Sequence, residues 1–276
     1  MVKTCFLLLL LVILGAGCLK KEGVTIEAFV GSASKPATEE AAKLFEKETG
    51  IKVHLHFGGS GKVLSQMLLA QKGDLYFPGS SDYMVKAKRK KAILPKTERK
   101  VVYLIPAINV PAHNPKAIAT LQDLTKEGVR IGIARPDSVC VGLYALEVLE
   151  KAKLREKVKN NVVTNAESCA KTAQLVALDS VDAVLGWRVF QYWNPKKIKT
   201  VLLKKDEVPR IGYIPIAIST FSKQRKEAQK FIDFLTSEKG RAIFRKWKYL
   251  ATLKEARKYT LPDTPVGGEW RGSEKL

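Results

Sequence analysis

Serine and glycine residues recur in this chain where a predicted strand passes into a predicted helix. The densest group is Gly58-Gly59-Ser60-Gly61, which precedes a helix predicted over 62–71. Hydroxyl residues stand at the other junctions of this kind: Ser32 and Ser34, Ser80 and Ser81, Ser138, and Ser168. A helix N-terminus exposes unpaired N–H groups and a partial positive charge, glycine lets the backbone approach closely, and serine adds an O–H donor. Several such ends together could hold an anion without a charged side chain.

Each junction also has a simpler explanation. Serine, aspartate and asparagine begin helices in proteins of every kind, so any one of these residues could be an ordinary N-cap. The glycine-rich loop lacks the Gly-Lys-Ser/Thr ending of a phosphate-binding P-loop, so a nucleotide site is poorly supported. Lys62, directly after the loop, could contact an anion but is better explained as a solvent-facing side chain.

The three histidines give little support to catalysis or to metal binding. His54, His56 and His113 stand in no nucleophile motif, and no pair of carboxylates lies near the junctions, so we expect no enzyme. His54 and His56 share one face of a strand, a spacing that can bind zinc, but the sequence shows no third ligand nearby. We therefore predict strand packing or surface positions for both, and neither a metal ion nor another cofactor.

Strands and helices alternate along the chain and place these junctions on one kind of scaffold. The predicted strands cover 24–30, 51–57, 74–77, 101–109, 129–134, 162–164, 181–185, 198–203 and 213–219. The predicted helices cover 37–49, 62–71, 141–152, 224–237 and 238–249, with two more that end at Lys91 and Leu178. This order predicts an α/β fold with mainly parallel sheets flanked by helices. Such sheets bind ligands at the carboxyl ends of their strands, where these helices begin.

The start of the chain has the pattern of an export signal. A positive residue precedes an unbroken apolar run over 6–14, and three small residues then lead into Cys18. A cysteine in this place resembles the lipobox of prokaryotic lipoproteins, in which Cys18 would carry the lipid. Plain secretion or an uncleaved anchor are the alternatives, although the apolar stretch is shorter than the ~20 residues that span a bilayer. We expect a signal peptide over 1–17, a linker over 18–23, and an extracytoplasmic lipoprotein anchored to the cell membrane.

The chain is strongly basic, with 48 Lys and Arg against 27 Asp and Glu and a net charge of +21. A basic protein invites nucleic acid as a partner. The export signal and the scattering of basic residues along amphipathic stretches argue against that partner, and binding of acidic polymers stays a distant alternative. The one dense run, 86–91, is expected to be a solvated helix face. A positive field would steer anions toward the protein.

Three stretches of the chain resemble one known family. They are GGSGKVLSQMLLAQKGDLYFPGSSDYM (58–84), RPDSVCVGLYALEVLEKAKL (135–154) and NAESCAKTAQLVALDSVDAVLGW (165–187). They resemble the serine-rich loop, the "DP…V-P-A-G-x-Y-A" segment and the last helix and strand of the ligand lobe in periplasmic molybdate-binding proteins of ABC importers. The similarity covers roughly 24–249, and it implies the type 2 periplasmic binding protein fold.

The resemblance implies a two-lobed protein that captures molybdate or tungstate and delivers it to an ABC permease in the membrane. One lobe, domain I, would comprise 24–102 plus 217–276, and the other, domain II, 103–216. Two crossing strands, near 101–106 and 211–216, would form a hinge that closes because the anion contacts both lobes at once. A monomer that binds no nucleic acid is expected.

Other oxyanions are the main alternative within the same fold. Sulfate, thiosulfate or phosphate could be the guest instead of molybdate or tungstate. A site made only of donors suits a fully ionised oxyanion, whereas a protonated phosphate needs an acceptor. Asp82 or Glu167 could supply that acceptor, so phosphate stays open at this point.

The resemblance also implies which residues bind the anion. The first anion-binding serine of the family falls at Ala33, so a hydroxyl of Ser32 or Ser34 beside it, or the backbone N–H alone, would serve. The second serine falls on Ser60, and Gly61 could add a backbone donor. The other positions are the backbone N–H groups of Val141 and Cys169, and the side chain of Trp187. Trp187 stands where the family has tyrosine, so it offers one N–H from a larger ring.

Cys140 and Cys169 belong to the segments that would form the second lobe's part of this site. The resemblance places them at neighbouring helix N-termini, where a disulfide between them would stiffen the wall that faces the anion. An extracytoplasmic compartment permits such a bond. Two free, buried thiols are the alternative.

Overall fold

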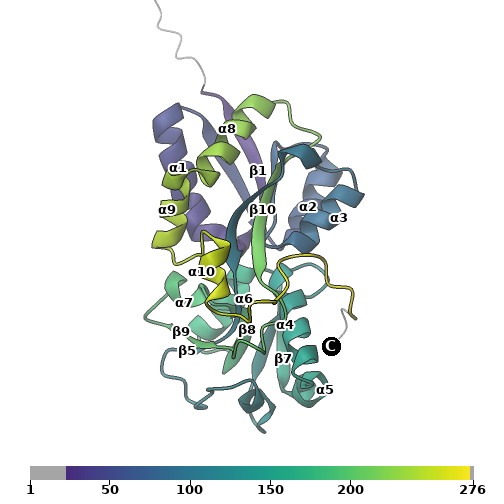
Figure 1. Ribbon diagram of the computed structural model, residues 1–276, viewed down its shortest axis with the longest axis vertical. Coiled ribbons are helices and arrows are strands. Elements are labelled where there is room, and N and C mark those ends of the chain that lie inside the picture. The colour runs from purple at the N-terminus through teal and green to yellow at the C-terminus, as the bar shows by residue number, and fades with distance from the viewer. Residues whose placement is uncertain (1–22, 274–276) are drawn as a thin grey trace, which may run out of the picture.

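The computed structural model describes residues 23–273 (Figure 1). The predicted signal peptide, Cys18 and all but the last residue of the predicted linker lie outside these residues, so the signal and the lipid remain predictions. Within the described part, no helix combines the length and the apolar character that crossing a bilayer requires.

Two five-stranded sheets, each with its helices, organise the molecule as two lobes, one above the other in Figure 1. The first sheet has the order β2 (Lys52–Gly58), β1 (Thr25–Gly31), β3 (Leu75–Phe77), β10 (Gly212–Ile218), β4 (Arg99–Leu104). The second sheet has the order β7 (Val162–Ala166), β6 (Ile131–Ala134), β8 (Ala183–Trp187), β5 (Pro106–Pro111), β9 (Ile198–Leu202). Strands β1, β2 and β3 are parallel, and so are β6, β7 and β8, whereas β10 and β5 pair antiparallel with their neighbours. Both sheets are thus mixed, and the α/β fold is as predicted.

Helices cover both faces of each sheet. The helices of the first lobe are α1 (Lys35–Thr49), α2 (Ser60–Ala70), α3 (Ser81–Arg89), α8 (Arg225–Thr236) and α9 (Glu238–Lys246). Those of the second lobe are α4 (Cys140–Lys151), α5 (Arg155–Val158), α6 (Cys169–Ala177) and α7 (Phe190–Trp193), and α10 (Leu253–Arg257) follows the last of the first-lobe helices. Figure 1 shows α1 and α9 on one side of the first sheet and α2 and α3 on the other. Helix α1 buries Ala37, Ala41 and Phe45, which recur at helical spacing, and it ends at Gly50, whose φ of 71° favours glycine.

The chain passes between the lobes along β4 and β10. Strand β4 lies in the first sheet, and after Ile105 the chain enters the second sheet as β5. The single strand predicted over 101–109 is therefore wrong in this respect, because its two halves belong to different sheets. Strand β10 pairs with β4, with a register shift between Ile214 and Pro215, a residue that has no N–H to give to the ladder. The predicted lobe boundaries at 102 and 217 fall inside these two strands and remain predictions.

Buried apolar residues of both lobes meet in one cluster. It joins Ala33 and Met67 of the first lobe to Val139, Cys169 and Trp187 of the second. A separate cluster forms the second lobe's own core, from Ile108, Ile131, Leu149 and other residues. The lobes are therefore in direct contact, as in a closed arrangement.

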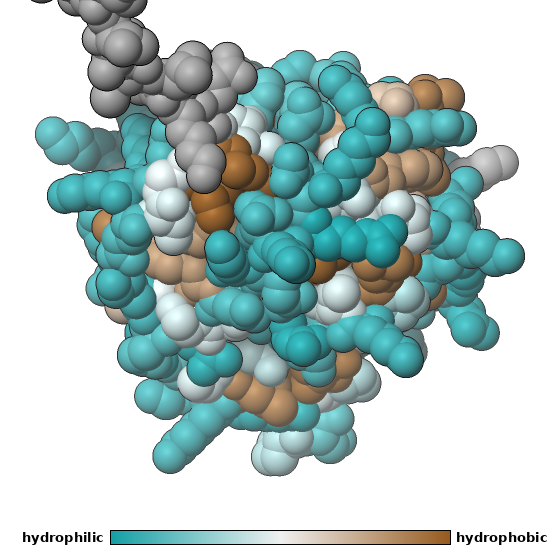
Figure 2. Space-filling view, turned by 90° about the horizontal axis from the view of Figure 1, so that it is seen from above, coloured by the Kyte–Doolittle hydropathy of each residue, from teal (hydrophilic) through white to brown (hydrophobic). Residues whose placement is uncertain are grey.

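The surface carries the chain's charge in a dispersed way. The end of the molecule seen from above is mostly hydrophilic, with smaller hydrophobic areas between long polar side chains (Figure 2). The dense basic run ends α3, where Lys88, Arg89, Lys90 and Lys91 are exposed. Lys88 pairs with Glu98 and Arg89 with Glu269, so this run behaves as a solvated face with acidic neighbours.

Candidate functional site

The starts of three helices meet where the two lobes touch. Helices α2, α4 and α6 begin at Ser60, Cys140 and Cys169, and a 3₁₀ turn, Ser32–Ser34, leads into α1. We call the buried residues at these starts the junction cluster: Ser32, Ala33, Ser60, Cys140, Val141 and Cys169. The convergence follows from topology, because the carboxyl ends of β1 and β2 and those of β6 and β7 face one another.

Ser60 is fixed by its own lobe. The Gly79 N–H donates to Ser60 Oγ at 3.0 Å, and the Tyr76 hydroxyl donates to the Ser60 carbonyl oxygen at 3.0 Å. Because Ser60 Oγ accepts a hydrogen bond from the backbone, its own O–H is left to donate. The Cys140 sulfur and this hydroxyl both border Gly79, where an added Cβ would lie 2.5 Å from Cys140 Sγ and 3.6 Å from Ser60 Oγ.

Ser32 and Ser34 differ in what they contact. Ser32 Oγ accepts a hydrogen bond from the Ala170 N–H of α6 at 3.2 Å, so it joins the two lobes and keeps its own O–H to donate. Ser34 Oγ accepts from Thr38 Oγ1 at 3.0 Å, within the start of α1. The carbonyl oxygen of Ala33, between them, accepts from the Tyr249 hydroxyl at 2.8 Å. Of the two hydroxyls predicted beside Ala33, that of Ser32 is the one in contact with the other lobe.

Two glycines that were not predicted as site residues allow the close packing around Ser60, Gly31 within the first lobe and Gly79 also against Cys140 of the second lobe. A Cβ added at Gly79 would lie 2.5 Å from Cys140 Sγ and 2.7 Å from the Ala33 Cβ, and one at Gly31 would lie 2.7 Å from Ser60 Oγ. Contacts that short do not fit side chains, so both positions require glycine. The sequence feature that could have indicated Gly79 is the Pro78-Gly79 pair, in the loop before a predicted helix.

Gly61, a predicted donor, already spans the lobes. Its N–H donates to the Ser138 carbonyl oxygen at 2.9 Å. A Cβ at Gly61 would lie 3.1 Å from the Ser138 Cα, which shows how closely this loop meets the second lobe. In the closed arrangement Gly61 therefore joins lobe to lobe and its N–H is not open to an anion.

Cys140 and Cys169 are buried free thiols whose sulfur atoms lie 3.5 Å apart. A disulfide needs about 2.0 Å between the two sulfurs, so the pair is close but not bonded. Burial raises the pKa of the Cys140 thiol, with the neighbouring Cys169 as the next cause, so Cys140 is held in its neutral form. A bond between the two remains a prediction.

Trp187 brings an unpartnered donor to this region. The residue is fully buried, and its ring packs edge-on against that of Tyr144 in α4, one turn after Val141, with centroids 4.7 Å apart. Neither the indole Nε1 nor the Tyr144 hydroxyl has a hydrogen-bond partner within residues 23–273. Buried polar groups without a partner are rare, so a bound acceptor would relieve this arrangement.

Asp82 is committed to other partners. It accepts from Arg210 Nη2 at 2.8 Å and Nη1 at 3.2 Å, from Ser80 Oγ at 2.8 Å, and from the Trp270 N–H at 2.9 Å. Glu167 is exposed and pairs with Lys171 at 2.7 Å. The acceptor positions of Asp82 are therefore filled, whereas Glu167 lies at the surface with Lys171 as its partner.

Arg210 connects the lobes beside this site. While Nη1 and Nη2 hold Asp82 of α3, Nε donates to Glu147 Oε2 of α4 at 2.7 Å. The guanidinium also lies over the Tyr144 ring, 4.0 Å from its centroid. Arg210 and Asp82 are almost entirely buried, so this ion pair is a fixed part of the interface.

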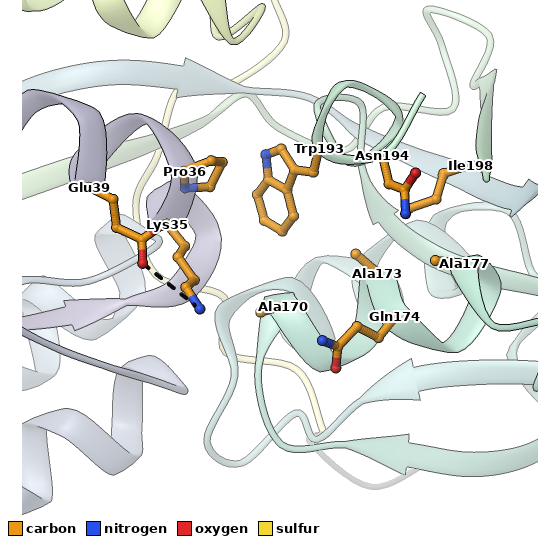
Figure 3. Close-up of a pocket in the computed structure, with 10 residues that line it drawn as sticks. All are labelled: Lys35, Pro36, Glu39, Ala170, Ala173, Gln174, Ala177, Trp193, Asn194 and Ile198. Carbon is orange, nitrogen blue, oxygen red and sulfur yellow. Dashed lines mark ion pairs between the residues drawn. The ribbon is translucent and has the colours of Figure 1, made fainter. Parts of the chain in front are cut away.

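A hollow of about 280 Å³ lies beside the Ser32–Ala170 hydrogen bond, at the rim of the interface (Figure 3). The start of α1 forms one wall, where Lys35 pairs with Glu39 at 3.9 Å. Helix α6 and Trp193 form the other, and Trp193 Nε1 donates to the Tyr249 hydroxyl at 3.2 Å. Because both lobes line the hollow, its shape changes when they separate.

Comparisons with known sequences agree with this architecture. Residues 26–250 match the sequence model of a family described as bacterial extracellular solute-binding protein. YvgL of Bacillus subtilis strain 168, named provisionally as an ABC transporter substrate-binding lipoprotein, is 26% identical over 247 residues, which cover 87% of this chain and 94% of that protein. The molybdate-binding protein ModA of Escherichia coli K12 is 26% identical over 131 residues, 46% of this chain and 51% of its own.

Solved structures share the fold. The periplasmic molybdate-binding protein of Azotobacter vinelandii superposes with a TM-score of 0.73 at 19% identity, over 82% of this chain and 99% of that one. The periplasmic binding protein AfuA of Actinobacillus pleuropneumoniae, with fructose-6-phosphate bound, gives 0.68 at 17% identity, over 88% of each chain. The predicted two-lobed periplasmic binding protein fold is confirmed.

Proposed function

The chain belongs to the family of bacterial extracellular solute-binding proteins, and on that premise we propose that it captures molybdate or tungstate between its two lobes. Members of this family bind substrates and are not enzymes, as expected from the sequence. The observation that carries the proposal is the buried meeting of the Ser32 and Ser60 hydroxyls with the starts of α4 and α6.

The junction cluster supplies donors and no charged side chain. Ser32 and Ser60 each hold an O–H that can turn toward a guest, because a backbone N–H fixes the oxygen from the other side. The first turns of α4 and α6 add backbone N–H groups, at Val141 and Cys169, and the positive ends of two helix dipoles. Trp187 Nε1, which has no partner in the part of the chain that the structure describes, is a further donor. Such a set favours a small dianion.

The occupied carboxylates favour a fully ionised guest. Asp82 is saturated by Arg210, Ser80 and Trp270, and Glu167 is exposed at the surface, so neither carboxylate is a free buried acceptor for a proton on the anion. This arrangement supports molybdate, tungstate or sulfate over protonated phosphate. The likeness to a protein named for molybdate binding in Escherichia coli and another in Azotobacter vinelandii supports the first two.

Capture would proceed by closure of the lobes. A bound anion adds hydrogen bonds to both lobes at once, so it favours the closed arrangement by its difference in affinity for the two states. The net charge of +21 would raise the rate at which anions arrive. We further propose that the protein acts as a monomer, is anchored through Cys18 and passes the anion to an ABC permease. The relative named as a substrate-binding lipoprotein in Bacillus subtilis supports the last two points.

Calorimetric titration with molybdate, tungstate, sulfate and phosphate tests the proposal. We expect one anion per chain, tight binding of molybdate and tungstate, and little loss of affinity at high salt. If the protein prefers sulfate or phosphate, that anion takes the place of molybdate or tungstate as the proposed ligand of the same site. Binding of acidic polymers that disappears with salt, without oxyanion binding, would contradict the proposal.

A further inference from the structure

A second group of ligand-type side chains lies outside the lobe interface. Atoms of Glu27, His54 and His56 that can bind a metal lie within 4.8 Å of one another. Glu27 and His54 are register partners on the parallel strands β1 and β2, and His56 follows two residues later on the same face. Strand pairing thus supplies the third ligand that the sequence spacing of the histidines did not reveal.

Two atoms of this group are buried without a hydrogen-bond partner among the described residues: Glu27 Oε2 and His56 Nε2. They lie 3.7 Å apart, which is too far for a hydrogen bond. Two ligands of one tetrahedral zinc ion lie about 3.4 Å apart when each bond is about 2.1 Å. A shared cation would therefore satisfy both atoms after a small movement of the side chains.

The His56 ring is prepared to act as a ligand. The ring stacks on Phe29, with centroids 4.8 Å apart, so its orientation is held. The His54 ring lies 4.5 Å from that of His56 and is exposed, so it can turn to complete the set.

The surroundings leave room for solvent ligands. His56 borders a hollow of about 510 Å³ that is also lined by Phe29, Gln66, Leu69, Ala70 and Lys72. The Lys72 ammonium lies 3.8 Å from Glu27 Oε1 but is largely exposed, so it can move away when a cation arrives. Glu27 precedes Gly31 by four residues along β1, about 13 Å at ~3.3 Å per residue, so this group is separate from the junction cluster.

We propose that Glu27, His54 and His56 bind one divalent cation of the zinc type, with the remaining coordination positions open to water. Two imidazoles and one carboxylate suit Zn²⁺, Co²⁺ or Ni²⁺, whereas Mg²⁺ and Ca²⁺ prefer oxygen ligands alone. The ion would tie the edge strand β2 to β1. This site is independent of the oxyanion site and of its proposed guest.

Metal titration of the chain, purified without a histidine tag, tests this site. We expect one equivalent of Zn²⁺ in competition with a chromophoric chelator, and Co²⁺ absorption bands of a nitrogen- and oxygen-bound ion. Glu27→Gln and His56→Gln should each lower Zn²⁺ affinity at least tenfold. Lys72→Gln should raise it, because a competing cation is removed.

The matched control is His113→Gln. His113 lies 3.8 Å from Asp179, both exposed, and so forms a histidine–carboxylate pair without a second imidazole. This variant should bind Zn²⁺ as the unaltered chain does. Absence of stoichiometric Zn²⁺ uptake by the unaltered chain, or equal uptake by the Glu27 and His56 variants with an unchanged melting temperature, would overturn the proposal.

Discussion

The backbone N–H of Ala170, at the start of α6 in the second lobe, donates a hydrogen bond of 3.2 Å to Ser32 Oγ in the first lobe. The Gly61 N–H makes a second backbone contact between the lobes, to the Ser138 carbonyl oxygen. The lobes are thus joined at the place where the donors converge. Closure and anion binding should therefore depend on the same few residues.

The hydroxyl groups of Ser32 and Ser60 should contribute to the affinity for the oxyanion, whereas that of Ser34 should not. Ser32→Ala and Ser60→Ala should each weaken oxyanion binding by roughly 1–3 kcal/mol, because a buried acceptor loses its donor. Ser34→Ala is the control, since the Ser34 hydroxyl contacts Thr38 in the first turns of α1 and, within residues 23–273, bonds to no group of the other lobe; the affinity of this variant should change less than twofold. Calorimetry on the three variants decides this. Equal losses for all three would mean that the serines act on folding and not on the anion.

Gly79 should control closure. Gly79→Ala places a Cβ against Cys140 Sγ of the second lobe, so the two lobes can no longer approach as closely at this point. We expect a large loss of affinity and a larger radius of gyration in X-ray scattering with the anion present. The melting temperature should fall as well, because the same Cβ lies 2.7 Å from the Ala33 Cβ within the first lobe. Normal closure of this variant would show that the residues around Gly79 can move further apart than the structure indicates.

Trp187 should contribute its indole N–H. Trp187→Phe removes a buried N–H that has no hydrogen-bond partner within residues 23–273, so it should weaken anion binding about tenfold, equivalent to ~1.4 kcal/mol. The ligand-free protein should lose less stability than the smaller ring alone would cause, because a buried donor without a partner is also removed. Trp270→Phe, in the C-terminal tail, serves as the control. Unchanged affinity in Trp187→Phe would remove this side chain from the site.

The Arg210–Asp82 pair should be essential for stability. Arg210→Met leaves the Asp82 carboxylate buried and unpaired, at a cost of about 3–5 kcal/mol. The double variant Arg210→Met/Asp82→Asn should lose less stability than Arg210→Met alone, because the fully buried charge of Asp82 is removed and only the less buried Glu147 has lost its partner. Denaturant unfolding of the single and double variants measures this difference. Losses of stability that simply add in the double variant would contradict the coupling between Arg210 and Asp82.

The two thiols should react slowly in the folded protein. Because burial raises the pKa of Cys140, the neutral thiol predominates at pH 7 to 8, and iodoacetamide should label it much more slowly than an exposed cysteine. Bound oxyanion should slow labelling further by holding the lobes closed. Mass spectrometry of the Cys140 and Cys169 peptides also separates the two redox states, since a disulfide would block labelling in denaturant until a reductant is added.

The sequence predicted the scaffold because its pattern is local. The alternation of strands and helices predicted the α/β class and most element positions, and the helix predicted over 37–49 ends before Gly50 in the structure. The break at Ile105 was missed, since both halves of the 101–109 stretch are equally apolar and only the packing of two sheets separates them. Helix α10 was missed because five residues give too short a pattern.

The candidate site was predicted in part for a similar reason. The starts of α2, α4 and α6 carry local signals, and the fold brings them together. Gly79 is defined by what approaches it from the other lobe, and Glu27 by its register with His54, so neither could be found from spacing along the chain.

The central claim is that one oxyanion is held by both lobes at the junction cluster. A crystal grown with tungstate tests it most directly, because tungsten gives a strong anomalous signal. We predict a single strong peak within hydrogen-bonding distance of the Ser32 and Ser60 hydroxyls and of the first turns of α4 and α6. A peak bound to one lobe alone, or no peak between closed lobes, would contradict the account.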